Sequence, residues 1–303
     1  MKPIRIAFVD FWRVFRRDDN FLLNTLRRWY DVQITERPDY LFHGDDRART
    51  HRGSDAVKIH VLVENRVPNF RACDYALSYR YLDDPRHRRL PHYVFYGPPE
   101  LLVKAPAEAE RLLAAKTKFC ALVVGNPNLK RTYRRLRFFE KLSKYKPVDS
   151  GGRFRNNIGG PVADKVAFLR DYKFHLCFEN ATSPGYTSEK IVHAMQARCL
   201  PVYWGNPRIA EEFNPRSFLN IPDAMSDEEA IERVIELDRD DDKYLAVARE
   251  PYFHGNTPNE YFDPERLRPF FEEIFSSTRK TRSWFYFRDL VFDLRVRWGL
   301  GKP

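Results

Sequence analysis

The chain has 303 residues, of which 43% are hydrophobic and 15% aromatic, so it is long enough for two domains and too apolar to be intrinsically disordered. Its formal net charge of +10 favours anionic partners such as nucleotides, nucleic acids or anionic membranes. Because zinc-finger spacings and the aromatic signature of RNA-recognition motifs are missing from the sequence, we expect no nucleic-acid partner.

The four cysteines lie far apart and form no C-x-x-C pair; they are Cys73, Cys120, Cys177 and Cys199. This spacing predicts reduced, packed thiols rather than a disulfide framework or a metal site. The sequence has no run of 18 apolar residues, and its start lacks the apolar core of a signal peptide. We therefore expect a cytoplasmic protein, at most peripheral on the inner face of the cytoplasmic membrane.

Strands and helices alternate in the first third of the chain. Apolar runs predict strands at residues 2–10, 32–35, 38–44, 58–64 and 75–79, and helical spacing covers residues 21–29. The alternation predicts an α/β domain with a largely parallel sheet, placed at residues 1–115. In such sheets ligands meet the carboxyl ends of the strands, where Asp10 and Glu64 fall. Trp12 and His43 lie at similar positions and are ligand-contact candidates on position alone.

A second α/β series follows at residues 116–275. Its predicted strands cover residues 118–125, the region of 148, 172–178 and 200–205, and its predicted helices cover residues 129–143, 191–197 and 226–237. A glycine-rich loop at residues 151–160 can approach a phosphate closely, because glycine lacks a Cβ atom. Arg155 and Asn156 within this loop are weaker candidates for phosphate contact.

The most informative segment reads YKFHLCFEN at residues 172–180 and GYTSEK at residues 185–190. The pattern predicts a strand, a loop and the first turn of a helix. Backbone N–H groups at a helix N-terminus bind anions, whereas a lysine there is unfavourable unless an anion lies nearby. Lys190 in that first turn therefore indicates an anionic ligand, and the arrangement suits a diphosphate.

Residues 276–303 predict a basic amphipathic helix. Five large apolar residues recur at helical spacing, namely Trp284, Phe287, Val291, Leu294 and Trp298. Between residues 279 and 302, seven Lys or Arg residues stand against two Asp. Such a helix can lie on an anionic membrane surface through residues 279–303, or it can pack back on the protein, and both interpretations stay open.

Several of these segments, in the same order, resemble the α1,3/4-fucosyltransferase family. The segments that resemble its long signature are residues 172–180, 185–190, PVYWG at 201–205 and FNPRSF at 213–218. Those that resemble its acceptor-domain block and the start of its donor domain are VEN at 63–65, PNF at 68–70, DY at 74–75, and GNPN at 125–128 with Arg131. The resemblance implies the GT-B arrangement: two Rossmann-like domains facing across a cleft, with residues 1–115 binding the acceptor and residues 116–275 binding the donor.

The family resemblance also implies a reaction and roles for residues. The reaction is inverting transfer of L-fucose from GDP-β-L-fucose to O3 or O4 of N-acetylglucosamine in a LacNAc-type glycan. Arg131 and Lys190 are implied to contact the diphosphate, and Glu64 matches the proposed general base. The residues implied to hold the ribose, the fucose or a nearby phosphate are Asn180, Tyr186 and Glu189. Asp10, Trp12 and His43 then become weak acceptor-binding candidates.

The residue types suit this chemistry. Glu64 can serve as base if it is partly buried, although a strand-end carboxylate in a salt bridge is the alternative. Arg131 can hold phosphate oxygens bidentately while Lys190 supplies a point charge, and both would stabilise departing GDP. The other arginines of this helix, Arg134, Arg135 and Arg137, are expected to form a solvated face.

Because positive side chains can replace a divalent ion at the diphosphate, we expect no obligatory metal and at most a stimulatory one. The acidic run at residues 240–242 is expected to be a solvated loop rather than a metal site.

Three alternatives stay open from the sequence. A GT-B transferase could use a different nucleotide sugar, which competition between GDP and UDP would reveal. A basic nucleic-acid-binding protein would bind DNA or RNA with a steep salt dependence and transfer no sugar. A lectin-like protein would bind the glycan without GDP. For the transferase, the acceptor would be an oligosaccharide or a lipid-linked glycan.

Overall fold

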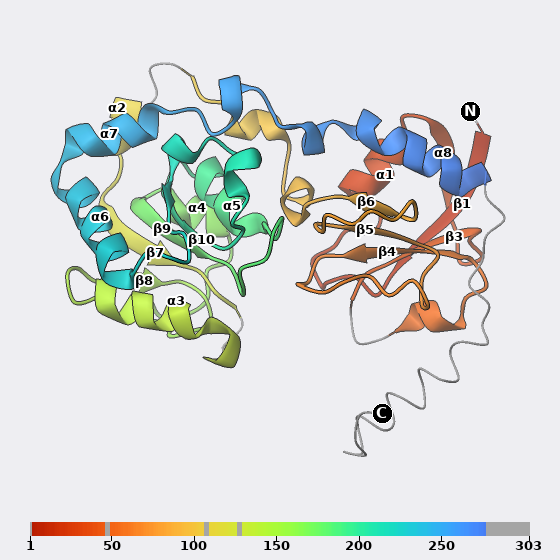
Figure 1. Ribbon diagram of the computed structural model, residues 1–303, viewed down its shortest axis with the longest axis horizontal. Coiled ribbons are helices and arrows are strands. Elements are labelled where there is room, and N and C mark those ends of the chain that lie inside the picture. Colours follow the sequence, from red (N-terminus) through yellow and green to blue (C-terminus); the bar gives the residue numbers. More distant parts are fainter. Residues whose placement is uncertain (1, 46–48, 106–108, 126–128, 277–303) are drawn as a thin grey trace, which may run out of the picture. The chain divides into compact units, whose positions relative to one another are not determined.

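The computed structural model describes residues 2–45, 49–105, 109–125 and 129–276. The chain forms two compact units, each built around its own sheet (Figure 1). The second unit comprises Pro91–Phe262, and the first comprises the chain up to Leu90 together with the described residues from Asp263 onwards. These bounds differ from the predicted 1–115 and 116–275, because the chain returns to the first unit near its end. The helix predicted at residues 276–303 lies outside the described residues, apart from Ser276.

The first unit contains a six-stranded parallel sheet in the order β2-β1-β3-β4-β5-β6. Its strands are β1 (Lys2–Val9), β2 (Tyr30–Ile34), β3 (Tyr40–His43), β4 (Val57–Leu62), β5 (Tyr75–Ser78) and β6 (His87–Arg89). Its described α-helices are α1 (Phe21–Leu26) and α8 (Arg268–Ser276).

Helix α8 completes the core of the first unit. Alternate residues of a strand share one face, and the face that carries Phe8 and Phe42 is apolar. The rings of these two residues stack at 5.2 Å, and the Phe42 ring centroid lies 6.1 Å from that of Phe271 in α8. Phe275 meets Tyr40 of β3 at 4.5 Å. The return of the chain therefore covers one face of this sheet.

The second unit contains a five-stranded parallel sheet in the order β11-β10-β9-β7-β8. Its strands are β7 (Lys118–Leu122), β8 (Val148–Ser150), β9 (Tyr172–Phe178), β10 (Leu200–Trp204) and β11 (Leu219–Asn220). Its described α-helices are α2 (Ala109–Ala114), α3 (Leu129–Leu142), α4 (Lys165–Leu169), α5 (Glu189–Gln196), α6 (Asp227–Arg239) and α7 (Asp241–Arg249). Two parallel sheets with helices confirm the predicted α/β class.

Local sequence signals explain several element ends. Helix α6, within the helix predicted at residues 226–237, begins with a capping box: the Ser226 side chain accepts from the N–H of Glu229, whose carboxylate accepts from the N–H of Ser226. Asp240 caps α7 by accepting from the N–H of Lys243. The prediction of a solvated loop at residues 240–242 was therefore wrong, because these acidic residues begin a helix.

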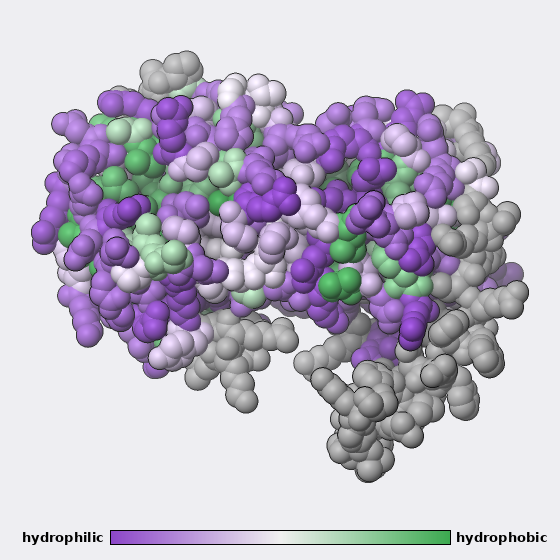
Figure 2. All heavy atoms as spheres, in the orientation of Figure 1, coloured by the Kyte–Doolittle hydropathy of each residue, from purple (hydrophilic) through white to green (hydrophobic). Residues whose placement is uncertain are grey.

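Short elements were missed in the sequence. Strand β6 lies in a stretch that reads as a connection rich in Pro, Arg and His, and β11 has only two residues. The cysteines are free and buried, as predicted. On the face shown in Figure 2, hydrophilic side chains dominate the described surface and apolar ones are scattered. None of the helices in the described ranges is both long enough and apolar enough to cross a bilayer.

Candidate active site

The end of β9 and the start of α5 meet around one buried carboxylate, that of Glu179. Its side chain has no exposed surface and accepts hydrogen bonds from the backbone N–H and the hydroxyl of Ser188, each at 2.8 Å. It also accepts from Lys190 Nζ at 2.8 Å. Ser188 is the N-cap residue of α5, yet its hydroxyl turns to Glu179 rather than to the helix. The strand, the loop and the helix predicted at residues 172–197 are thus confirmed and joined by this network.

Lys190 and Glu189 form the charged first turn of α5. Burial by itself would lower the pKa of Lys190, but Glu179 and Glu189 hold that pKa above its ordinary value. Burial would likewise raise the pKa of Glu189, but Lys190 and Lys165 hold that pKa below its ordinary value. Both groups are therefore charged at neutral pH. Because Lys190 already has a carboxylate partner within the protein, its place in the first turn is weaker evidence for an anionic ligand than the sequence indicated.

Two neutral histidines border Glu189. His92 Nδ1 lies 3.9 Å from Glu189 Oε2, and burial lowers the pKa of His92 to about 4. Burial lowers the pKa of His193, one turn along α5, to about 4 as well. At neutral pH neither imidazole carries a charge, so the positive charge near Glu189 comes from the lysines. No sequence pattern pointed to His92, because it lies nearly 100 residues before Glu189.

Helix α3 fixes the other side of the end of β9. Arg135 is almost completely buried and donates to the Phe178 carbonyl at 2.5 Å and to Asn180 Oδ1 at 3.1 Å. The predicted contact residue Asn180 is thereby held by an arginine. Arg131 lies one turn before Arg135 in the same helix, and its side chain is outside the described part of the structure.

The prediction that Arg134, Arg135 and Arg137 of α3 form a solvated face was wrong. Besides the buried Arg135, Arg134 Nε and Arg137 Nε donate to the two carboxylate oxygens of Asp227 at 3.1 and 2.6 Å. Asp227 is the first residue of α6 and has no exposed side-chain surface. These arginines therefore join α3 to α6. A count of charges along the helix could not show which arginines face the protein.

The side chain of Asn206 holds the loop between β9 and α5. Its side-chain oxygen accepts from the Gly185 N–H at 2.7 Å, and its amide donates to Thr187 Oγ1 at 3.0 Å. Gly185 has a φ of 82°, which glycine adopts without strain. Tyr186 between them is 4% exposed, so the predicted contact residue is largely enclosed by the protein. Side-chain hydrogen bonds from Asn206 therefore fix the conformation of this loop.

The glycine-rich loop between β8 and α4 packs tightly against the backbone that follows β7. A Cβ atom on Gly152 would lie 2.0 Å from the carbonyl oxygen of Val124, so only glycine fits there. Asn156 donates to the Gly152 carbonyl at 2.8 Å and braces the loop itself. Arg155 is exposed, has a φ of 46°, and pairs with Glu140 at 3.5 Å. The structure gives Asn156 and Arg155 local partners, and neither is joined to the Glu179 network by a described contact.

In the first unit, Glu64 lies just after the carboxyl end of β4, as predicted. Glu64 is exposed, so it lacks the partial burial that would favour a general base. Beside it, Asn65 Oδ1 accepts from the Tyr79 hydroxyl and from Arg80 Nη2. This polar group lies at the carboxyl ends of β4 and β5.

Asp10 and His43 have structural partners in a stack of histidines. Asp10 has a φ of 56° and no exposed side-chain surface; it accepts from His51 Nδ1 at 2.6 Å and from the backbone N–H groups of Thr50 and His51. Burial would raise the pKa of Asp10, but the bonds from His51 and Thr50 hold it below its ordinary value. The buried His43 ring stacks between His51 at 4.0 Å and His60 at 4.5 Å. These contacts favour a structural role for both acceptor-side candidates.

Trp12 belongs to an aromatic cluster after β1. Its ring meets Phe11 at 5.6 Å and Phe15 at 5.2 Å, and those two rings stack at 3.9 Å. Trp12 is only partly buried, so this candidate keeps an accessible surface. Within the described ranges, the structure contains no group of three His, Cys, Asp or Glu side chains arranged to hold a metal.

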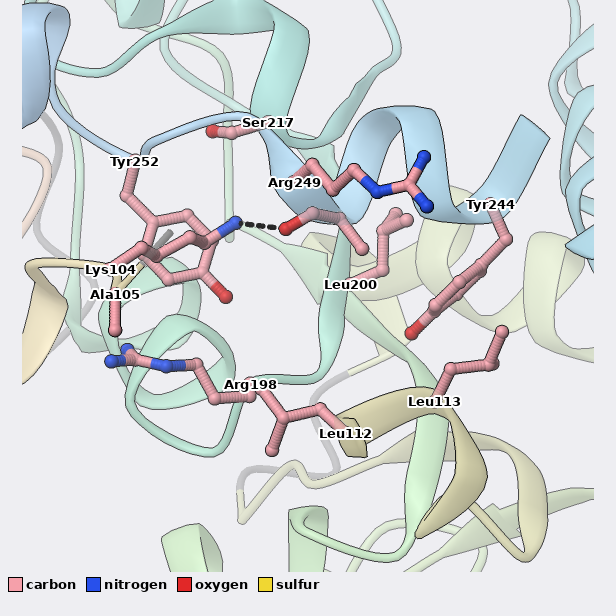
Figure 3. Close-up of a pocket in the computed structure, with 11 residues that line it drawn as sticks. Lys104, Ala105, Leu112, Leu113, Arg198, Leu200, Ser217, Tyr244, Arg249 and Tyr252 are labelled. Carbon is pink, nitrogen blue, oxygen red and sulfur yellow. Dashed lines mark hydrogen bonds between the residues drawn. The ribbon is translucent and has the colours of Figure 1, made fainter. Parts of the chain in front are cut away.

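A separate pocket lies at the start of β10, near Leu200 (Figure 3). Lys104 Nζ donates to the carbonyls of Ala248 and Glu250 at 2.7 and 2.6 Å, and it lies 3.7 Å from the centroid of the Tyr252 ring. The cavity measures about 30 Å³, enough for ordered water but too small for a sugar nucleotide. Since it is at the opposite end of the strand from the Glu179 network, Lys104 serves there as a structural brace.

Two family models match the chain. The model described as "Glycosyltransferase family 10 (fucosyltransferase) C-term" matches residues 113–253. The model described as "Alpha-(1,3)-fucosyltransferase FucT N-terminal domain" matches residues 6–96. The two matches cover most of both units.

Individual proteins agree with these matches. The chain is 29% identical over 292 residues to the α-(1,3)-fucosyltransferase FucT of Helicobacter pylori. This alignment covers 82% of this chain and 60% of that protein. It is 34% identical over 157 residues to 3-galactosyl-N-acetylglucosaminide 4-α-L-fucosyltransferase FUT3 of Bos taurus, covering 51% of this chain and 42% of that protein. The chain thus spans less than two thirds of the length of either relative.

A solved structure extends the similarity to nearly the whole fold. A crystal structure of an α1,3-fucosyltransferase with GDP-fucose aligns with a TM-score of 0.71 and 28% sequence identity, covering 92% of each chain. The similarity in fold therefore covers both units.

Proposed function

The chain belongs to glycosyltransferase family 10, the fucosyltransferases, and we propose that it moves L-fucose from GDP-β-L-fucose to O3 or O4 of N-acetylglucosamine in a LacNAc-type glycan, with inversion. The observation that carries this proposal is the arrangement at the end of β9. There Asn180, Glu189 and Lys190 lie on one braced strand–loop–helix unit around a buried carboxylate.

The charge at this unit suits a nucleotide diphosphate. The ammonium of Lys190 lies at the N-terminus of α5, where backbone N–H groups and the helix dipole also favour an anion. Position 131 lies on α3, one turn before the arginine that holds Asn180. We assign Arg131 and Lys190 to the two phosphates of GDP. As the bond from the fucose carbon to the diphosphate breaks, these cations stabilise the charge that grows on GDP.

The remaining predicted residues of the donor side are assigned to the sugars. Glu189 is charged and 24% exposed, so its carboxylate can accept hydrogen bonds from neighbouring hydroxyl groups of ribose or fucose. Asn180 and Tyr186 shape the same loop. We give Arg155 and Asn156 no direct role, because the structure gives each a partner within or beside its own loop.

Glu64 is assigned as the general base that removes the proton from the acceptor hydroxyl. The oxygen freed of its proton then forms a bond to the fucose carbon on the face opposite the departing GDP. Although Glu64 is exposed rather than partly buried, it lies at the carboxyl end of β4, where it is open to an acceptor glycan, and the leaving group needs no separate acid. Trp12, which follows β1 in the same unit, offers a partly exposed ring that suits stacking on a sugar.

Neutralisation of the diphosphate by side chains leads us to propose that turnover requires no metal, although a divalent ion can stimulate it. The test is transfer from GDP-fucose to N-acetyllactosamine in EDTA, with GDP and UDP as competing inhibitors. Transfer that GDP inhibits and UDP does not would support both donor and metal independence. Transfer only after Mg²⁺ is restored would overturn the metal proposal alone. Inhibition by UDP rather than GDP would favour the alternative of a different nucleotide sugar.

We further propose that the enzyme is cytoplasmic and peripheral on an anionic membrane surface through residues 279–303, where it would meet a lipid-linked glycan. The support is the amphipathic and basic sequence of that segment. Deletion of residues 279–303 should abolish co-sedimentation with phosphatidylglycerol vesicles while transfer to a soluble acceptor continues. Loss of folding on deletion would instead show that the segment packs on the protein.

A further inference from the structure

The carboxylate of Glu179 is the most completely enclosed charge of the candidate site. Both of its oxygens accept from the Ser188 hydroxyl at 2.8 Å, one also accepts the Ser188 N–H, and the other accepts Lys190 Nζ. A buried carboxylate is tolerated only when such partners satisfy it. The sequence motif contains this residue, but neither its charge pattern nor the resemblance gave it a role.

The backbone at the end of β10 restricts where the Glu179 side chain can lie. A Cβ atom on Gly205, just after β10, would lie 2.5 Å from Glu179 Cγ and 2.9 Å from Glu179 Cβ. The backbone N–H of Glu179 also donates to the carbonyl of Trp204 at 2.8 Å. Glu179 is therefore packed against the end of the neighbouring strand β10, which restricts where its side chain can lie.

The ammonium of Lys190 is the group that it holds. Lys190 Nζ lies 2.8 Å from both Glu179 Oε2 and Ser188 Oγ, and 3.9 Å from Glu189 Oε1. An ammonium has three N–H donors, and within the described residues two of them make hydrogen bonds at 2.8 Å. A lysine side chain has four rotatable bonds, so without these contacts its charge would occupy many positions.

We infer that Glu179 is a positioning residue that fixes the Lys190 ammonium for contact with the diphosphate of the donor. This inference rests on the proposed function. Glu179 does not itself touch the substrate, since its side chain has no exposed surface. Its negative charge offsets part of the charge of Lys190, so it contributes placement of the cation rather than affinity for the anion.

This role predicts a split between turnover and binding. Glu179→Gln keeps the shape and can still accept from the Ser188 N–H, but it presents an amide to the Lys190 ammonium. We expect kcat for fucose transfer to fall at least about tenfold, because a misplaced charge stabilises the leaving group poorly. The affinity for GDP, measured by calorimetry, should stay within about threefold, because the lost negative charge makes the site more positive as the placement worsens.

A double-mutant cycle with Lys190→Met separates positioning from structure. If Glu179 acts through the ammonium, Glu179→Gln should lower kcat no further once Lys190 is Met. Glu179→Asp keeps the charge but shortens the side chain, and it should recover less than half of the lost kcat. Glu236→Gln breaks an exposed carboxylate–lysine pair with Lys243 in the same unit and serves as the matched control.

The possible outcomes are distinct. Equal losses of kcat from Glu179→Gln with and without Lys190, or loss of GDP affinity in parallel with stability, would show a structural role and overturn the inference. An unchanged kcat in Glu179→Gln would overturn it too. If the wild-type protein transfers no fucose yet binds GDP, the proposed function fails. The inference is then tested on GDP binding alone: Lys190→Met should weaken it, Glu179→Gln should leave it within about threefold, and equal weakening by both variants would overturn the inference.

Discussion

The exposed carboxylate of Glu64 offers a direct residue-level test of the proposed chemistry. Glu64→Gln keeps the size of the side chain but removes the acceptor of the proton. We expect kcat to fall by about 100-fold or more, the lower range for loss of a general base. GDP affinity should not change, because Glu64 lies in the first unit and the donor residues in the second. Loss of GDP binding in this variant would contradict the division of roles.

A second test concerns the buried guanidinium of Arg135. Arg135→Gln should lower the free energy of unfolding of the second unit by about 3 kcal/mol, because it leaves the Phe178 carbonyl and Asn180 without their donor. Urea denaturation measures this change. Arg155→Gln, at an exposed site, should change the same free energy by less than about 0.5 kcal/mol. Equal effects of the two variants would refute the assigned burial.

At the scale of single residues, the sequence predicted where the site residues lie better than it predicted which side chains are buried. The motif pointed correctly to the place where Asn180, Glu189 and Lys190 gather, because strand, loop and first helical turn are contiguous. It could not show that Arg135 is buried, since the burial depends on contacts with a strand some 40 residues later. The position of Asp10 at the end of a strand predicted contact with a ligand. In the structure the chain folds back so that the N–H groups of Thr50 and His51 bind the Asp10 carboxylate instead.

Among the elements, the glycine-rich loop depends on a close approach between two backbones. Gly152→Ala should destabilise the second unit by about 3 kcal/mol, because the added carbon would lie 2.0 Å from the Val124 carbonyl oxygen. Gly159→Ala is the matched control: the space there is open, and only its φ of 88° opposes alanine, at about 1–2 kcal/mol. Denaturant unfolding of both variants should rank them in this order, and the reverse order would show that the loop yields easily.

Periodicity identified the long strands and helices and failed on short or distant ones. Helix α6 was predictable because its capping box and apolar spacing are local. Strand β6 was not, because three polar residues in a row carry no alternating pattern of apolar and polar side chains. The residues of α8 were assigned to the second domain: their phenylalanines show that the segment needs an apolar partner, but not that the partner is β3.

For the whole molecule, stability should fall as the pH falls from 7 to 5. Burial lowers the pKa of His87 in the first unit and of His193 in the second to about 4. Below the ordinary pKa of about 6.5 the unfolded chain binds protons that the folded chain excludes, so the stabilisation present above that pH is lost on acidification. Each histidine contributes about 2 kcal/mol to the loss between pH 7 and pH 5.

Urea unfolding at both pH values measures this dependence. His193→Gln should reduce the pH dependence of the stability of the second unit. Burial is the main cause of the lowered pKa of His193; Lys165 lowers that pKa further, and Glu189 raises it. Stability that is equal at pH 7 and pH 5 would mean that these rings are protonated in the folded protein or are reached by water.

The return of α8 to the first unit also sets an order in which the chain can fold during synthesis. The second unit is one continuous stretch, Pro91–Phe262, so all of its residues are synthesised before α8. The first unit, although it is translated earlier, must wait with the apolar face of Phe8 and Phe42 uncovered until Phe271 and Phe275 arrive. The half of the protein that begins the chain is thus the last to mature, and its unfinished sheet is the surface that a chaperone would meet.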